Sequence, residues 1–237
     1  YTPIVEPASL DEAYLDVTDR VQPFGSATAI AEAIRGRVRE ETGLTVSIGV
    51  SDSRLVAKIA SDFNKPDGLT VVPPHRVEAF LAPLPLRTLQ GVGPATERIL
   101  GGMGIATVAD LRARAPEVLA GALGQFGRTL HGFARGIDPR PVGVPRQRKS
   151  LGMEDTFSED LRTLADMDPV LAAMAIRVGE QLRAWSLAGR TVTVKVRYPD
   201  FCTPTRSQTL SRPTNDPEVI AGWARTLLRR TEAGTLS

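Results

Sequence analysis

The feature that most constrains the fold is an alternation of strand-like and helix-like segments along the first 74 residues. The first segment alternates with a period of two, which places the apolar residues Ala13, Leu15 and Val17 on one side of a strand. The whole stretch predicts strands at 13–17, 45–50 and 69–72 and helices at 27–41 and 52–63. Gly43 is expected to stop the first helix, and Asp52 to cap the second. Strands separated by helices favour an α/β sheet.

Proline, glycine and charge patterns divide the rest of the chain. Residues 75–140 read as helices punctuated by glycine, and residues 141–147, with two prolines, read as a linker. Residues 148–237 read as strand, helix, strand, strand and helix, with helix starts at Asp168 and Asp216, each followed by proline. The first of these helices is expected to bury Leu171, Met174, Val178, Leu182 and Trp185. We therefore predict an α+β multidomain protein with domains at 1–74, 75–140 and 148–237.

Two adjacent acids, Asp11 and Glu12, open the first predicted strand. Charges at the start of a buried strand are costly unless a cation meets them. Carboxylate oxygens suit Mg²⁺, which takes one or two carboxylates together with substrate phosphates. An isolated Asp-Glu pair at the start of a strand is usually a solvated turn, so the dipeptide alone favours that interpretation, and the surrounding sequence has to decide.

Charge and cysteine content narrow the class of protein only slightly. The net charge of +2 is too small to indicate a nucleic-acid partner, but position says more. Asp138 is the one acid between residues 125 and 150, against six cations: Arg128, Arg135, Arg140, Arg146, Arg148 and Lys149. A single cysteine, Cys202, excludes an internal disulfide. No apolar run reaches membrane-span length and no signal peptide opens the chain, so we expect a cytoplasmic monomer without a membrane partner.

The stretch Leu-Gln-Gly-Val-Gly-Pro-Ala-Thr-Glu-Arg-Ile-Leu at 89–100, followed by Gly-Ile-Ala-Thr-Val-Ala-Asp-Leu at 104–111, resembles a helix-hairpin-helix. Two glycines around an apolar residue make a tight turn before a helix. Amides at such a turn suit an anion, here a DNA phosphate. The residues expected to present these amides are Gly91, Val92, Gly93 and Ala95. A plain turn between two helices is the alternative.

A second basic surface is expected in the last block. Residues 190–198 alternate, with four apolar side chains on one face and Thr193, Lys195 and Arg197 on the other. Neighbouring predicted strands add further cations, which are Arg146, Arg148, Lys149 and Arg206. Together they predict a basic sheet surface along duplex DNA, although a merely solvated face fits the alternation too.

Two long motifs carry a family resemblance. The first is Ser-Leu-Asp-Glu-Ala-Tyr-Leu-Asp-Val-Thr at 9–18. The second begins with Ser-Ile-Gly-Val-Ser at 47–51 and continues with Leu-Val-Ala-Lys-Ile-Ala-Ser-Asp-Phe-Asn-Lys-Pro-Asp-Gly-Leu at 55–69. Both resemble palm motifs of Y-family DNA polymerases, the low-fidelity translesion enzymes, of the DNA polymerase IV (DinB) type. The resemblance covers essentially the whole chain.

The resemblance implies an architecture and a set of roles. It implies a partial palm, an all-helical thumb with the helix-hairpin-helix, and a β-α-β-β-α little finger. Asp11 and Glu12 match catalytic metal ligands for two Mg²⁺ ions, Lys65 matches a lysine that reaches the incoming triphosphate, and Lys58 matches a second, less certain lysine. The implied partners are primer-template DNA, a dNTP and, through a segment beyond Ser237, a sliding clamp.

Parts of the family pattern are not matched in these 237 residues. We expect a further palm strand with a third metal carboxylate and the fingers upstream, and a last little-finger strand downstream. The chain by itself is therefore expected to bind DNA without polymerising. The alternatives are a non-catalytic polymerase-like DNA-binding module and a structural helix-hairpin-helix scaffold.

Overall fold

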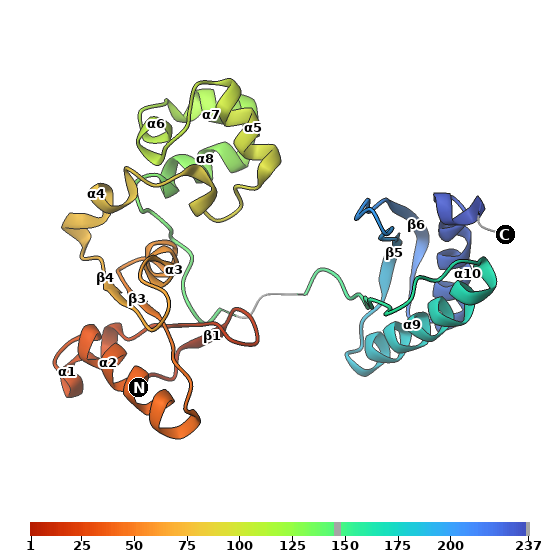
Figure 1. Cartoon of the computed structure of the whole chain (residues 1–237), viewed down its shortest axis with the longest axis horizontal. Helices are drawn as coiled ribbons and strands as arrows, with labels where there is room; N and C mark the ends of the chain where they lie inside the picture. Colours follow the sequence, from red (N-terminus) through yellow and green to blue (C-terminus); the bar gives the residue numbers. More distant parts are fainter. Residues whose placement is uncertain (145–147, 236–237) are drawn as a thin grey trace. The chain divides into compact units, whose positions relative to one another are not determined.

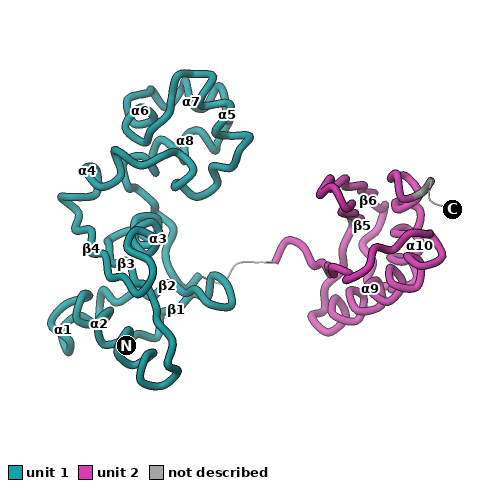
Figure 2. Tube along the Cα trace, in the orientation of Figure 1, with its two compact units in different colours: residues 1–145 teal, residues 146–237 magenta. Residues whose placement is uncertain are grey.

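The computed structural model describes residues 1–144 and 148–235, and the chain separates into two compact units (Figures 1 and 2). Unit 1 comprises residues 1–145 and unit 2 residues 146–237. The finer division predicted within unit 1, at residue 74, stays a prediction. No helix in the described part of the chain is both long and apolar enough to cross a membrane.

Unit 1 opens with a β-hairpin followed by two helices. Strands β1 (Val5–Pro7) and β2 (Ala13–Leu15) pair antiparallel, with Glu6 opposite Tyr14. Helices α1 (Val21–Phe24) and α2 (Ala27–Thr42) follow. Ser26 caps α2, and Gly43 ends it in the left-handed conformation, which confirms the predicted stop.

The next elements are two parallel strands that a third helix connects. Strands β3 (Ile48–Val50) and β4 (Leu69–Val71) pair in parallel, and α3 (Arg54–Phe63) connects them. A Cβ on Gly49 would stand 2.0 Å from the carbonyl oxygen of Ala57, so the strand approaches α3 closely only because this residue is glycine.

Three details of the first 74 residues were predicted wrongly. Among the described residues the strands form two separate pairs, not one α/β sheet. Ser53, rather than Asp52, caps α3, because its hydroxyl accepts the Val56 amide. In β2 the partly buried residue is Tyr14, while Ala13 and Leu15 are exposed, because the hairpin turns its Glu6–Tyr14 side toward α3.

The remainder of unit 1 is helical, apart from an isolated bridge between Pro85 and Thr107. Its helices are α4 (Val77–Leu81), α5 (Pro94–Gly102), α6 (Val108–Arg112), α7 (Pro116–Leu123) and α8 (Gln125–Phe133). One hydrophobic core runs from Leu55 on α3 to Ala134 after α8. Short 3-10 helices lie at Thr18–Arg20, Pro74–Arg76 and Leu86–Thr88 in unit 1 and at Glu232–Thr235 in unit 2.

Unit 2 packs two helices against one strand pair. Helices α9 (Leu164–Ala184) and α10 (Pro217–Leu228) pack together, and strands β5 (Gly189–Lys195) and β6 (Thr205–Thr214) pair antiparallel. The predicted apolar face of β5 is confirmed, because Val192, Val194, Val196 and Tyr198 all join the core. The start of α10 at Asp216 is confirmed too.

Three predictions for unit 2 were wrong. No strand forms over the described residues 148–163, so the order is α-β-β-α. Helix α9 begins four residues before Asp168, because Thr163 and Asp166 form a capping box there. Pro169 therefore lies inside the helix and not at its first position. Trp185, expected in the core, is 41% exposed, because it is the C-cap of α9 and lies beyond the last helical turn that faces the core; Arg148 covers part of its ring.

Candidate functional site

The acidic pair lies at the end of the β1–β2 hairpin. The amides of Ala8 and Ser9 donate to the carbonyl of Glu12 at 2.8 and 3.3 Å, which closes the turn. Asp11 is exposed and accepts a 2.7 Å hydrogen bond from the Ser9 hydroxyl. That hydrogen bond holds the pKa of the Asp11 carboxyl below its ordinary value, so Asp11 stays charged at neutral pH.

Both lysines of the second motif meet acids. Lys58 Nζ lies 2.5 Å from Glu12 Oε1 and 3.7 Å from Asp62 Oδ2. Lys65 Nζ lies 2.6 Å from Asp62 Oδ1. Burial opposes the charge on Lys58, but its hydrogen bond to Glu12 and the nearby Asp62 carboxylate raise its pKa overall. Helix α3 therefore connects the acidic hairpin to the Lys65 loop through a chain of ion pairs.

The donor set tests whether a divalent cation fits here. Asp11 and Glu12 supply two adjacent carboxylates, the hard ligands such an ion accepts. No group of three or more His, Cys, Asp and Glu side chains placed to hold a metal occurs in residues 1–144 and 148–235. The pair thus fits a cation that takes its other ligands from water or phosphate, and Glu12 would exchange Lys58 for it.

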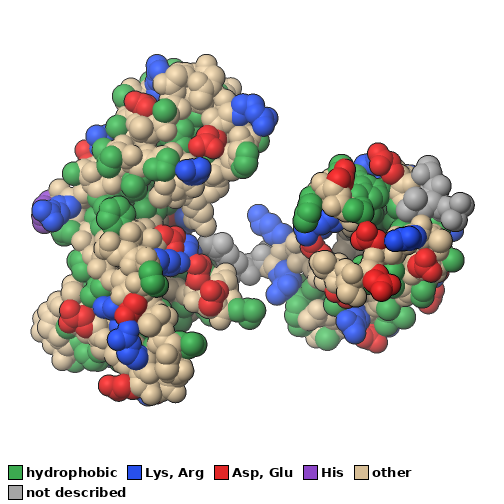
Figure 3. All heavy atoms as spheres, viewed as in Figure 1, with side chains coloured by type: hydrophobic (Ala, Val, Ile, Leu, Met, Phe, Trp, Pro, Cys, Tyr) green, Lys and Arg blue, Asp and Glu red, His purple; other side chains and the backbone are tan. Residues whose placement is uncertain are grey.

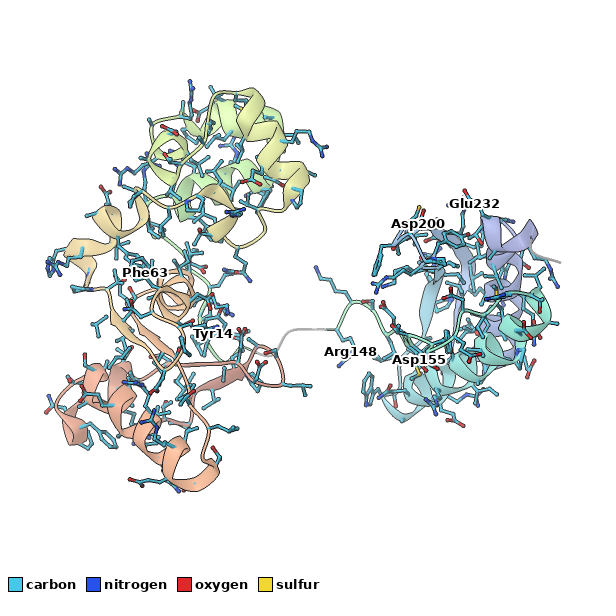
Figure 4. All side chains as sticks on the ribbon, in the orientation of Figure 1. Tyr14, Phe63, Arg148, Asp155, Asp200 and Glu232 are labelled. Carbon is cyan, nitrogen blue, oxygen red and sulfur yellow. The ribbon has the colours of Figure 1, made fainter. Side chains whose placement is uncertain are left out.

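A buried cation fixes the hairpin to α3. The Arg54 side chain is 4% exposed, and its two terminal nitrogens each lie 2.9 Å from a Glu6 carboxylate oxygen. Its guanidinium also lies 4.3 Å from the ring centroid of Tyr14, a residue labelled in Figure 4. The same pair also binds residues 141–143. Arg54 donates a hydrogen bond to the Pro141 carbonyl, and Glu6 accepts one from the Gly143 amide, both at 3.2 Å.

A tight turn forms at residues 89–93, directly before α5, as the glycines suggest, with one exception. Gly91 has φ of +90°, and a Cβ there would stand 2.8 Å from the Phe126 ring, so glycine is required. The Val92 amide donates to the Leu89 carbonyl at 3.1 Å, so the expectation that Val92 presents its amide to a phosphate is wrong. The amides of Gly91, Gly93 and Ala95 have no acceptor within the described ranges.

Arg140 contacts that turn through Gln90. It forms an ion pair with Asp138 at 2.6 Å, donates to Gln90 at 2.8 Å and stacks over Phe133 at 5.3 Å. The hydrogen bond to Asp138 raises the pKa of Arg140. This predicted cation is thus held within unit 1 and steadies the residue next to Gly91.

Most of the basic side chains predicted for the unit 2 surface contact other groups of the protein. Lys195 and Arg197 both approach Glu154. Arg206 donates to the carbonyls of Arg230 and Thr205, and the Arg148 guanidinium lies 4.4 Å from the Trp185 ring centroid. Lys149 is exposed with no ion pair in the described part, and Arg146 lies outside the described residues. On the visible face of unit 2, acidic and basic side chains are interspersed (Figure 3).

Sequence reasoning missed Glu6, Arg54 and Glu154. Each acts through a partner at least 41 residues away, and no periodic or local motif pairs residues across such a separation. The one available signal was Arg54, a cation directly before the apolar residues of α3.

Comparison with known proteins identifies relatives across the chain. The impB/mucB/samB family matches residues 1–62, and the impB/mucB/samB family C-terminal domain matches residues 148–236. DNA polymerase IV of Alkalilimnicola ehrlichii is 50% identical over 99% of this chain and 66% of its own length. DNA polymerase IV of Desulfatibacillum aliphaticivorans is 44% identical over 99% of this chain and 59% of its own. The chain thus spans 59% to 66% of the length of these two relatives.

Solved structures agree with these matches. The Y-family DNA polymerase chimera Dbh-Dpo4(243-245)-Dbh has a TM-score of 0.79 at 27% identity, covering 97% of this chain and 66% of its own. The insertion ternary complex of Dbh DNA polymerase has a TM-score of 0.58 at 26% identity, covering 98% of this chain and 67% of its own. Both have mixed helix and sheet architectures similar to that described above.

Proposed function

This chain belongs to the impB/mucB/samB family of Y-family DNA polymerases, of the DNA polymerase IV type, and we propose on that premise that it serves low-fidelity, template-directed DNA synthesis across damaged bases. The observation that carries the proposal is the chain of ion pairs from Glu12 through Lys58 and Asp62 to Lys65. It brings two matched motifs, 46 residues apart at Glu12 and Lys58, to one place. A solvated turn does not need such a partner.

The acidic hairpin would hold the reacting groups of a phosphoryl transfer. Asp11, charged and exposed, and Glu12, once released from Lys58, are the residues that would bind Mg²⁺. Magnesium ions, when bound, supply activation of the primer 3′-hydroxyl and neutralisation of phosphate charge. Lys65 is exposed on the loop after α3, and a flexible ammonium there suits contact with a triphosphate.

Primer-template DNA would contact both units. In unit 1 the amides of Gly91, Gly93 and Ala95 suit a backbone phosphate, a contact that does not depend on base sequence. In unit 2 the candidates are Arg148, Lys149, Lys195, Arg197 and Arg206, and residue 146 of the same set lies outside the described ranges. We further propose a cytoplasmic monomer and, in the complete protein, a sliding clamp as partner.

A non-catalytic DNA-binding module is the second candidate for these 237 residues taken alone. The observation in its favour is that two carboxylates, and not three, meet at the hairpin within the described residues. We propose that the chain alone binds primer-template DNA without extending it.

Two measurements on the purified 237-residue chain test this proposal. Fluorescence anisotropy with labelled primer-template DNA should show salt-dependent binding, and primer extension with Mg²⁺ and dNTPs should show no product. Absence of DNA binding would overturn the proposed function. Extension at the intact mass of 25.5 kDa would show that the two carboxylates suffice.

Cation binding is tested without activity. Mn²⁺ should broaden the amide resonances of residues 10–13 in the chain, and Asp11→Asn should abolish that broadening. Asp52→Asn, an exposed acid outside the hairpin, is the matched control and should leave it unchanged. Equal broadening in the Asp11→Asn variant would contradict the assignment of this residue.

A further inference from the structure

Glu154 places an acid among the cations of unit 2 that we propose for DNA. Its Oε2 lies 2.5 Å from Lys195 Nζ, and its Oε1 lies 3.7 Å from Arg197 Nη2. The two oxygens thus serve different cations. Glu154 belongs to the segment 148–163, which is not a strand, so these ion pairs connect that segment to β5 and the residues after it.

Apart from Lys195, the side of β5 that carries Thr191 and Thr193 has no cation to offset the charge of Glu154. Thr191 pairs with Thr209 at 3.1 Å, and Thr193 pairs with Ser207 at 2.9 Å. Along this side the cationic character therefore comes from the two residues that Glu154 contacts. The carboxylate beside them places one negative charge next to their two positive charges and so weakens their attraction for a phosphate.

The contact is open to competition. The side chains of Glu154, Arg197 and Lys195 are 58%, 49% and 41% exposed, so water and ions reach all three. Exposed ion pairs are weak, and DNA offers both cations charge-assisted hydrogen bonds to phosphates that belong to a polyanion, with release of its counterions. When phosphate displaces Glu154, however, the carboxylate stays nearby and repels it.

We propose, on the basis of the proposed function, that Glu154 limits the affinity of this protein for DNA by competing with phosphate for Lys195 and Arg197. The hydrogen bond from Lys195 holds the pKa of the Glu154 carboxyl below its ordinary value, so the competitor keeps its charge throughout the neutral range. Its removal should strengthen binding, which is the opposite of the usual effect of removing an ion pair.

The test is anisotropy of labelled primer-template DNA with the full chain and its Glu154→Gln variant. We expect the variant to bind about three- to tenfold more tightly at 50 mM salt, with the gain shrinking as salt screens the charges. Glu180→Gln is the matched control, an exposed acid on α9 with the same charge change and no ion pair among the described residues. It should bind like the wild type.

A second pair of variants tests whether Glu154 acts through Lys195 and Arg197. In a chain carrying Lys195→Gln and Arg197→Gln, the addition of Glu154→Gln should give no further gain, because the cations it masks are gone. Equal affinity of wild type and Glu154→Gln would overturn the inference, as would an undiminished gain in that background or an equal gain from Glu180→Gln. If neither wild type nor any variant binds DNA, it is the proposed function that fails.

Discussion

At the scale of single residues, Asp67 holds the loop that carries Lys65. Its carboxylate pairs with Arg35 at 3.0 Å and with Arg39, and both arginines are on α2. The Asp67 backbone is in the left-handed region, with φ of 53°, so side-chain contacts must offset some strain. The hydrogen bond from Arg35 holds the pKa of the Asp67 carboxyl below its ordinary value.

A depressed carboxyl pKa makes stability depend on pH in one direction. The contribution of Asp67 is present above its unfolded pKa, near 4, and is lost as pH falls through the lower folded value. We expect urea unfolding followed by circular dichroism to show a smaller loss of stability between pH 6 and pH 3 in Asp67→Asn than in the wild type. Asp19→Asn, which removes an exposed acid without an ion pair in the described part, should follow the wild type. A pH profile of Asp67→Asn parallel to that of the wild type would contradict the role of this residue.

The residues of the site divide into those a local motif reveals and those it does not. Asp11, Glu12 and Lys65 belong to continuous motifs, so their importance is readable from neighbouring residues. Glu6 and Arg54 lie 48 residues apart, and only the folded chain pairs them. The Val92 amide was misjudged because a turn hydrogen bond to Leu89 depends on backbone geometry.

At the scale of elements, the two glycines of the turn at 89–93 are needed for different reasons, one for packing and one for access to the start of α5. Gly91 has φ of +90° and faces the Phe126 ring, whereas a Cβ on Gly93 would meet nothing within 4 Å. The first glycine is therefore required by the chain's own packing. The second leaves the start of α5 uncovered, which is where we propose a phosphate.

Alanine at each position separates stability from binding. We expect Gly91→Ala to lower the free energy of unfolding by about 1–3 kcal/mol, because it adds strain and overpacks the ring. Gly93→Ala should change stability by less than about 0.5 kcal/mol and still weaken DNA binding several-fold, since its methyl group would obstruct the amides. Urea denaturation and anisotropy measure the two effects. Unchanged DNA affinity in Gly93→Ala would count against the phosphate site.

Element boundaries were predictable where one capping signal stood alone. Gly43 and Asp216 mark helix ends as expected. Where two signals compete, sequence does not rank them, and the capping box at Thr163 prevails over the Asp168 start. Strand pairing was less predictable, because three-residue strands carry little pattern and their partners are set by packing.

At the scale of the whole molecule, each unit has its own hydrophobic core. The core of unit 1 involves buried residues from 55 to 134, and the clusters of unit 2 involve residues from 151 onward. Both tryptophans, Trp185 and Trp223, belong to unit 2. Tryptophan fluorescence therefore reports on unit 2, and circular dichroism on both.

This separation makes a buried ion pair testable in one unit. We expect Glu6→Gln to lower the free energy of unfolding of unit 1 by about 3 kcal/mol, because it leaves the charge of Arg54 buried without its partner. The unit 1 transition in circular dichroism should move to lower urea, while the fluorescence transition stays in place. Arg37→Gln, which breaks an exposed pair with Glu41, is the control and should move neither. A shift of the fluorescence transition in Glu6→Gln would show that the units unfold together.

Short-range patterns in the chain encode the helical segments, the strand periodicity of β5, the glycine turn and two motifs whose residues are neighbours in the chain. Which charges meet became apparent only in the folded chain. The tertiary structure set Glu12 against Lys58, Glu6 against Arg54, and Glu154 against Lys195 and Arg197. The physical reason is that a local pattern fixes the direction of a side chain relative to its own element, whereas an ion pair depends on how two elements pack.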